Sequence, residues 1–431
     1  MGRAPSEPSS QVMRSRVVDV AVIGCGIVGL SIAFQLRRRG LSCLLIDPRG
    51  PAGDASHGNA GAVSVGNLMP QSTPGMILPA LLGLRDPLAP FKLDAGAWPH
   101  YAGWLWRFLR AGSAARLAPI VDATHALNRA ARAAWLELAD AIDAIDLISP
   151  TGYLHVYSED AGFERSARAR AHMRRNGVAF DVLDAAQLRE LEPGLAAFTR
   201  HGVLQRDSLF VREPGEFCRR LFNWLCARGA DTLIASAHAI EREGEGYRVR
   251  TSGGDAHVDQ VVVAAGAWSG ELLRPFGLHL PVAAARGYHA MYPRQEGVVR
   301  RPTLWAERYM VVSPMRSGVR VTGFKEMSAP GRPARPALIR GLAPQARLLF
   351  PSLAGQPVSD WAGLRPCTPD SLPILDRVDD ERIFIATGHG HLGLTQGPIS
   401  GELVAQAMAG EVVSVPLAPY GLARFGRYAR A

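Results

Sequence analysis

The sequence predicts an α/β fold: a mostly parallel sheet domain, assembled from separated segments, that carries an inserted α+β domain with an antiparallel sheet. Three observations lead to this expectation. A strand–turn–helix–strand pattern occupies residues 17–46, and buried strand patterns return at 257–263 and 383–386. Between these, alternating strand patterns follow one another over residues 287–324. At 431 residues the chain is long enough for two or three domains.

The first unit contains a glycine spacing typical of dinucleotide-binding turns. After an apolar strand, Gly24 permits the sharp turn, Gly26 lets the backbone approach a pyrophosphate, and Gly29 lets the next helix pack on the strand. The helix is expected to start at Ile27. The free N–H groups of Ile27 and Val28 in its first turn, and the positive end of the helix dipole, would face the phosphates. The pattern favours a Rossmann-type domain; the alternative is a glycine-rich turn in an unrelated α/β protein.

The second strand, at 42–46, ends in Asp47, which is placed to accept a hydrogen bond from a ribose 2′-hydroxyl. A loop of small residues follows. Its backbone could lie close to a flat ring, with Ser56 and Asn59 bonding phosphate or ring edges beside Ala60 and Gly61. The alternative interpretation is an ordinary surface loop.

The later elements follow in chain order from hydrophobic periodicity and turn residues. We expect helices at 97–111, 121–145, 213–228, 337–349 and 397–408, and strands at 152–157, 203–211, 232–234, 247–251, 257–263, 287–292, 308–313, 319–324 and 383–386. Pro344 is expected to interrupt its helix. Residues 315–318 form a predicted hairpin turn.

These elements predict a terminal tail and two domains. We expect a disordered tail at 1–16, a dinucleotide-binding domain from 17–75, 212–275 and 361–431, and a substrate domain from 76–211 and 276–360. The strand at 257–263 ends in Ala265, Gly266 and Trp268, where the adenosine half of a cofactor could pack. The alternative there is an ordinary glycine between a strand and a loop.

Arg365 lies inside the otherwise apolar segment 361–370. A guanidinium there is costly unless an acceptor meets its fork of donors, as a bidentate substrate carboxylate would. The alternative is an internal ion pair with Asp370 or Asp376.

A glycine–histidine loop leads into the last helix, whose N-terminus would stabilise the negative charge of a reduced flavin. Its candidate contacts are Gly388, His389, Gly390, His391, Gly393 and Leu394. Two histidines without a third ligand argue against a metal site. Contacts to the ring or substrate, or hydrogen bonds within the loop, are the expected roles.

The bulk composition limits partners and compartment. The net charge of +9 comes from scattered arginines without interleaved aromatic residues, so we expect a solvated basic surface and no nucleic-acid partner. Five cysteines without a CxxC pair favour a reducing, cytoplasmic location. An apolar stripe on the helix at 97–111 has two interpretations. It is either core or subunit interface, or a peripheral contact with the inner face of the cell membrane that hands electrons to a quinone. Its residues are Ala97, Tyr101, Trp104, Leu105, Phe108 and Leu109.

Taken together, the motifs resemble those of the D-amino-acid oxidase/glycine oxidase superfamily, and above all its D-amino-acid dehydrogenase members, which include D-hydroxyproline dehydrogenases. The resemblance extends from Val17 to Gly410. It rests on the segments 22–29, 59–61, 188–193, 361–370 and 387–394, in this order and spacing.

The resemblance implies FAD as cofactor and an active site between two domains. It implies that Arg365 holds the substrate carboxylate, that Tyr288 assists it, and that His391 faces substrate or flavin. The implied reaction is oxidative deamination of a D-amino acid, with proline-like substrates included. Hydride passes from the α-carbon to flavin N5, giving an imino acid, and the electrons go on to a quinone, a protein carrier or oxygen. Alternatives are a sarcosine/glycine-type amine oxidase and a flavin-binding subunit of a larger dehydrogenase complex.

Overall fold

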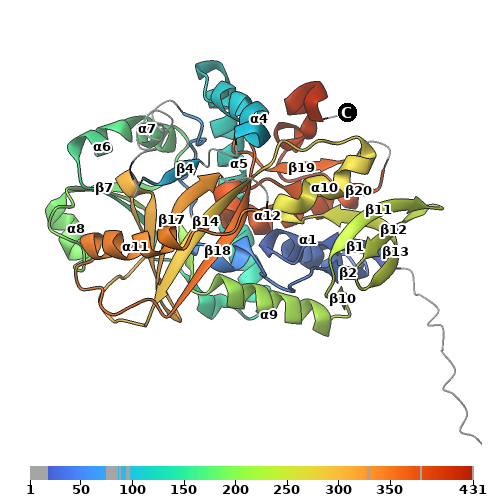
Figure 1. The fold of residues 1–431 in the computed structure, drawn as a ribbon, viewed down its shortest axis with the longest axis horizontal. Coiled ribbons are helices and arrows are strands. Elements are labelled where there is room, and N and C mark those ends of the chain that lie inside the picture. The colour runs from blue at the N-terminus through green and yellow to red at the C-terminus, as the bar shows by residue number, and fades with distance from the viewer. Residues whose placement is uncertain are drawn as a thin grey trace, which may run out of the picture.

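The chain folds around two large sheets that lie toward opposite ends of an elongated molecule (Figure 1). The structure, a computed structural model, describes residues 18–73, 86, 89–93, 98–327, 331–378 and 381–429. The tail expected at 1–16 and the stripe residue Ala97 lie outside these ranges.

The first sheet is an eight-stranded sheet whose centre is parallel, in the order β10–β2–β1–β13–β20. Its strands are β1 (Val18–Ile23), β2 (Cys43–Ile46), β10 (Asp231–Leu233), β11 (Ala237–Glu243), β12 (Gly246–Thr251), β13 (Gly254–Val263), β19 (Ile374–Arg377) and β20 (Ile383–Thr387). The central strands are Val- and Ile-rich and buried on both faces, as parallel strands require. Segments far apart in sequence therefore meet in one sheet.

Helices pack on this sheet and on one another to form the largest apolar core. They are α1 (Ile27–Arg38), α5 (Ala114–Ala141), α9 (Pro214–Ala227) and α12 (Gly393–Met408). The contact between α1 and α12 is very close, because a Cβ on Gly401 would lie 2.6 Å from the carbonyl carbon of Ser31. Trp135 of α5 is fully buried, and its Nε1 donates to the carbonyl of Leu394 at the start of α12.

The second sheet has nine strands, most of them antiparallel, in the order β18–β14–β17–β16–β15–β6–β8–β7, with β4 also paired to β17. They are β4 (Phe91–Leu93), β6 (Tyr153–Tyr157), β7 (Phe180–Leu183), β8 (His201–Gln205), β14 (Ala283–Tyr292), β15 (Thr303–Trp305), β16 (Met310–Met315), β17 (Gly318–Met327) and β18 (Ser359–Cys367). One face is covered by α11 (Pro336–Leu349). The other is covered in part by α4 (Trp98–Ala111).

A small third sheet and several short helices complete the description. The sheet pairs β3 (Ala62–Val63), β9 (Leu209–Val211) and β5 (Ile148–Ser149). The helices are α2 (Ala55–Gly58), α6 (Asp160–Arg165), α7 (Ala167–Arg175), α8 (Ala185–Leu191) and α10 (Ser269–Leu273).

The predicted fold class is confirmed, and the differences from the predicted elements have physical reasons. Pro344 does not interrupt α11, because the helix buries Leu338, Leu342 and Leu349 against the sheet and this packing outweighs one lost backbone bond. The strand β18 was not expected, since its residues do not alternate between buried and exposed.

The division into domains stays a prediction, and two features cut across its expected boundaries. The boundary at 361 falls inside β18, which pairs with β14 of the second sheet. The helix α5, expected in the substrate domain, packs on α12 within the core of the first sheet.

The apolar stripe of α4 packs largely inside the molecule. Tyr101 and Trp104 are buried against the second sheet, and Trp104 Nε1 donates to the carbonyl of Cys367. Leu109 is exposed. Across the described helices, none combines the length and apolar character that a bilayer-spanning segment needs. All five cysteines are free thiols.

Candidate active site

The glycine turn between β1 and α1 leaves no room for side chains. Gly24 has a φ of +111°, and a Cβ there would lie 2.4 Å from the carbonyl oxygen of Ala264 at the end of β13. A Cβ on Gly29 would lie 1.9 Å from the carbonyl oxygen of Gly24. Both glycines are thus required by close backbone contacts, and the start of α1 lies directly against the ends of the central strands.

Ser56 lies at the N-terminus of α1, where the sequence predicts the pyrophosphate site. Its Oγ accepts a hydrogen bond from the Ile27 N–H at 2.9 Å, and a Cβ on Gly26 would lie 3.0 Å from that Oγ. A helix N-terminus with a bare glycine and a hydroxyl beside it is suited to phosphate oxygens. These residues therefore fit the pyrophosphate of a dinucleotide.

The carboxylate of Asp47 is fixed beside the same turn. One oxygen accepts from the N–H of Cys25 at 2.9 Å and the other from the N–H of Arg49 at 2.8 Å. Each carboxylate oxygen can accept a second bond, so capacity for a ribose hydroxyl remains. At the neighbouring end of β13, Gly266 accepts a bond from the Thr387 hydroxyl at 2.8 Å.

Ala265 and Trp268 lie next to Gly266 at this strand end, and the Trp268 ring is 5.5 Å from the Arg49 guanidinium carbon. The structure thus brings together residues from the ends of β2, β13 and β20. These are the strand ends at which ligands bind in open parallel sheets.

The loop after α2 is held mainly through its backbone. The Asn59 side chain bonds Ser56 and Gly61 of its own loop. The carbonyls of His57 and Asn59 accept bonds of 2.9 Å from Arg320, and the carbonyl of Ala60 accepts a bond from the Ser313 hydroxyl.

Arg320 was not singled out in the sequence, although it is 1% exposed and fixes this loop to the second sheet. Burial lowers its pKa to about 10, so the guanidinium stays protonated at neutral pH. Its charge is met by Glu213 at 3.4 Å. Asp54 makes a further link, because its carboxylate accepts from the N–H of Leu364, one residue before Arg365.

The two loop histidines have different surroundings. His389 is buried with its Nε2 2.9 Å from the Ser400 hydroxyl of α12, and burial lowers its pKa to about 3. It is a hydrogen-bonded loop histidine, one of the two roles expected for it. Gly388 and Gly390 adopt positive φ on either side, and Gly393 with Leu394 begins α12.

Arg365 extends from β18 across the neighbouring strand. It is paired with Ala285 of β14, and its guanidinium lies on the backbone of Gly287, where a Cβ would be 2.2 Å from Cζ. Nη1 reaches the carbonyl of Phe324 on β17 at 3.4 Å. A side chain at position 287 would therefore displace the guanidinium.

The expected alternative, an internal ion pair, is not found. Asp370 pairs with Arg424 at 2.8 Å, and Asp376 accepts the N–H of Leu422. Within the described ranges no carboxylate pairs with Arg365, whose pKa burial lowers. A partly buried guanidinium with one long bond to a carbonyl retains donors for an external anion.

His391 faces the same region as Arg365. Burial lowers its pKa to about 3, and the positive charges of Lys325 and Arg365 act in the same direction. The imidazole is therefore neutral across the physiological range. Lys325 was also not singled out in the sequence.

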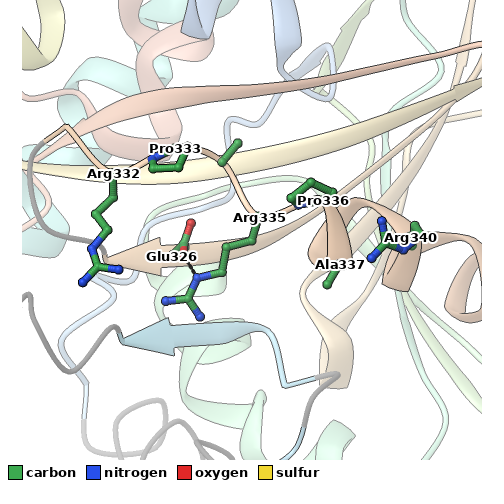
Figure 2. Close-up of a pocket in the computed structure, with 8 residues that line it drawn as sticks. Glu326, Arg332, Pro333, Arg335, Pro336, Ala337 and Arg340 are labelled. Carbon is green, nitrogen blue, oxygen red and sulfur yellow. Dashed lines mark ion pairs between the residues drawn. The ribbon is translucent and has the colours of Figure 1, made fainter.

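Tyr288 does not join Arg365. It follows Gly287 on β14, so its side chain points to the opposite face, under α11, and is fully buried. Its hydroxyl donates to Glu326 and accepts from the N–H of Arg335. Figure 2 shows Glu326 and Arg335 paired. Both residues line a surface pocket of about 450 Å³. The expected role of Tyr288 at the substrate carboxylate is corrected by this geometry.

Trp361 of β18 packs against the end of α2 and so joins this segment to the second sheet. Its indole stacks on His289 at 5.4 Å and contacts Gly58, where a Cβ would lie 2.1 Å from the ring. His289 in turn bonds the carbonyl of Gly58 at 3.0 Å. The α2 segment, whose Ser56 bonds the start of α1, is thus in direct contact with the Arg365 face of the second sheet.

Comparisons with known proteins agree with this geometry. Residues 19–407 match the DAO family, described as FAD dependent oxidoreductase. The chain is 33% identical over 417 residues to a D-amino-acid oxidase of Bradyrhizobium diazoefficiens, covering 94% of this chain and 98% of that protein. It is 31% identical over 431 residues to a D-amino acid dehydrogenase of Paramagnetospirillum magneticum, covering 95% and 100%.

A solved structure has the same fold. Glycine oxidase from Geobacillus kaustophilus superposes with a TM-score of 0.76 at 21% identity, covering 94% of this chain and 98% of that one. The predicted resemblance and the predicted cofactor, FAD, are confirmed. The chain belongs to the DAO family of FAD-dependent oxidoreductases.

Proposed function

We propose that this protein catalyses the oxidative deamination of D-amino acids, with the substrate carboxylate bound by Arg365. The observation that carries the proposal is a guanidinium held on Gly287 without a carboxylate partner in the described part of the chain. A carboxylate meets such a fork through two parallel hydrogen bonds. The D-configuration is proposed because two relatives above 30% identity are a D-amino-acid oxidase and a D-amino acid dehydrogenase.

The residues of the glycine turn would hold FAD. We assign the pyrophosphate to the N-terminus of α1 with Gly26 and Ser56, and a ribose hydroxyl to Asp47. The start of α12 supplies the positive end of a helix dipole for the ring. When bound there, FAD would supply the acceptor for the α-hydrogen and its electron pair.

The protein's own contribution to the reaction is chiefly orientation. Arg365 fixes one end of the substrate, which limits the positions its α-carbon can take. His391 stays neutral and so adds no positive charge beside the amine. The amine reacts in its unprotonated form, and no side-chain base is required. Most of the rate acceleration then comes from positioning and preset electrostatics.

Several finer points belong to the same proposal. Proline-like D-amino acids are included as substrates, and the acceptor is a quinone, a protein carrier or oxygen. The five free thiols support a cytoplasmic location, because thiols persist in a reducing compartment. A peripheral contact with the inner face of the membrane, or with a partner subunit, would place the acceptor close to the protein.

The direct test is flavin bleaching under anaerobic conditions. Purified protein is mixed with D- and L-amino acids, D-proline, D-hydroxyproline, sarcosine and glycine, and the flavin absorbance is followed. We expect D-amino acids to bleach it. Bleaching by sarcosine and glycine alone would assign the alternative amine oxidase activity, and a flavin that stays oxidised with every compound would refute the proposal. Repeating turnover with a dye and with oxygen alone identifies the acceptor.

A variant tests the role of Arg365. Arg365→Lys keeps the charge but loses the fork of donors, so we expect KM to rise about tenfold or more while flavin content is retained. Arg286→Lys is the matched control, because Arg286 lies on β14 but faces Glu326 and Pro333 on the opposite side. An unchanged KM in Arg365→Lys would remove Arg365 from the carboxylate site.

A further inference from the structure

A second cation, Lys325, shares the face of the sheet on which Arg365 lies. A bulge interrupts the pairing of β14 and β17 between Arg286 and Tyr288, and Phe324 in the bulge has a φ of +55°. Phe324 then packs under α11, whereas Lys325 is paired with Phe91 of β4 on the α4 side. Because Arg365 bonds the Phe324 carbonyl, its guanidinium ends beside the backbone of Lys325.

In the described part of the chain no acid neutralises the charge of Lys325. Its Nζ donates to the side-chain oxygen of Gln71, which is uncharged. The next residue, Glu326, faces the other side of the sheet and is taken up by Arg335 and Tyr288. Among the described residues Lys325 forms no ion pair, as is also true of Arg365. Two partly buried cations side by side are unfavourable without anions to meet them.

Both charges act on one place, the ring of His391. The positive charges of Lys325 and Arg365 each lower the pKa of this histidine, after the larger effect of burial. The three side chains come from β17, β18 and the turn before α12; β18 contacts that turn, and Arg365 reaches the β17 backbone beside Lys325. The surroundings of His391 are therefore positively charged through both Lys325 and Arg365.

Lysine is rare in this chain, which makes its position here informative. Of the 48 Lys and Arg residues, Lys92 and Lys325 are the only lysines. Lys92 lies opposite Glu326 in the β4–β17 pairing and donates to the carbonyl of Asp86, so it faces away from Arg365. A lysine supplies a compact ammonium with three donors, which suits a single carboxylate end group.

We propose that Lys325 binds a second carboxylate of the substrate, so that the preferred substrates are dicarboxylic D-amino acids. This inference rests on the proposed function, because it takes Arg365 as the site of the α-carboxylate. Lys325 is then a residue that determines substrate specificity, without a part in the oxidation itself.

Isosteric substrate pairs test the inference. We expect kcat/KM for D-glutamate to exceed that for D-glutamine, and D-aspartate to exceed D-asparagine, by about tenfold or more. In Lys325→Met the preference should fall to near unity, because kcat/KM for the acidic substrates drops while kcat/KM for the amides changes little. Lys325→Arg should retain part of it. Lys92→Met is the matched control, with the preference intact.

Two outcomes would overturn the inference while leaving the proposed function standing. One is equal turnover of acids and amides by the wild-type enzyme. The other is an equal loss for both substrate types in Lys325→Met, which would assign Lys325 to the reaction instead of the side chain. If no amino acid bleaches the flavin, the proposed function itself fails.

Labelling supplies a readout independent of turnover and of any variant's folding. The holoenzyme is treated with an amine-acylating reagent, and the extent of labelling at Lys325 is read by mass spectrometry with Lys92 as the internal reference. We expect glutarate to protect Lys325 at concentrations at which butyrate does not. Equal protection by the two acids, or none by either, would contradict a second carboxylate site.

Discussion

The two halves of this molecule build their binding sites in different ways. In the first sheet the proposed FAD cradle, the turn from Gly24 to Gly29, is shaped by close backbone contacts: a Cβ on Gly24 or Gly29 would overlap a backbone carbonyl. In the second sheet the proposed substrate site is made by side chains from several strands, with Arg365 crossing Gly287 and Lys325 placed by a bulge. A site built by backbone is encoded in a short contiguous motif. A site built by side chains depends on strand register and order.

The largest effect is expected where the backbone contact is closest. Gly29→Ala would place a Cβ 1.9 Å from the carbonyl oxygen of Gly24, so α1 must shift away from the turn. We expect a destabilisation of about 3 kcal/mol and loss of most bound FAD. Flavin absorbance of the purified protein and its thermal midpoint measure both effects.

Gly103→Ala is the control, a helical glycine whose nearest neighbour to an added Cβ is the flexible tip of Arg107 at 3.6 Å. It should bind FAD normally and be slightly more stable. If Gly29→Ala kept its flavin and its stability, FAD binding would not depend on the close contact between Gly29 and the Gly24 carbonyl.

In the second half the matching substitution is Gly287→Ala. The added Cβ would overlap the Arg365 guanidinium and displace it from the Phe324 carbonyl, while the glycine turn is untouched. We expect KM for amino acids to rise about 10- to 100-fold with flavin content unchanged. Steady-state kinetics and the flavin spectrum separate the two halves.

Gly270→Ala controls for the substitution itself, because the nearest atom to its Cβ is 3.9 Å away. A Gly287→Ala protein with unaltered KM would mean that substrate binding does not need the guanidinium to lie on the backbone of Gly287.

The same difference decides which parts of the two sites could be predicted from the sequence. The glycine spacing with Asp47 predicts the cradle, because each role is set by its neighbours along the chain. The position of Arg365 in an apolar segment points to an unusual arginine. Which carbonyl it reaches could not be foreseen, since β18 has no alternating pattern. A phenylalanine does not indicate a positive φ, so the bulge at Phe324 could not be predicted. The face on which Lys325 lies depends on that bulge.

The position of Tyr288 could not be predicted either, because neighbours in a strand lie on opposite faces of the sheet. It leads to a third prediction. Its place next to Arg286 and Gly287 in the sequence suggests the substrate site, yet strand alternation puts it on the opposite face with Glu326. Tyr288→Phe should leave KM unchanged and lower the unfolding free energy by about 2 kcal/mol, because a bond to a buried carboxylate is lost. A KM raised as in Gly287→Ala would return Tyr288 to the carboxylate site.

The smallest effect concerns proton binding by His389, in the cofactor half. Burial lowers its folded-state pKa to about 3, below the value near 6.5 of an unfolded chain. Well above pH 6.5 both states are neutral and this histidine does not alter stability. As the pH falls below 6.5 the unfolded state takes up a proton that the folded state does not, so stability declines. Between pH 7 and 5.5 this amounts to about 1 kcal/mol for one histidine.

His389→Gln removes this titration while an amide can still bond the Ser400 hydroxyl. The wild-type protein should lose about 1 kcal/mol more than the variant over that pH interval, measured as unfolding free energy at each pH. The difference isolates His389, because the other buried histidines titrate alike in both proteins. Identical losses would mean that His389 takes up its proton in the folded state, which requires water to reach it beneath α12. The start of that helix would then be less closed than the contacts of His389 and Trp135 indicate.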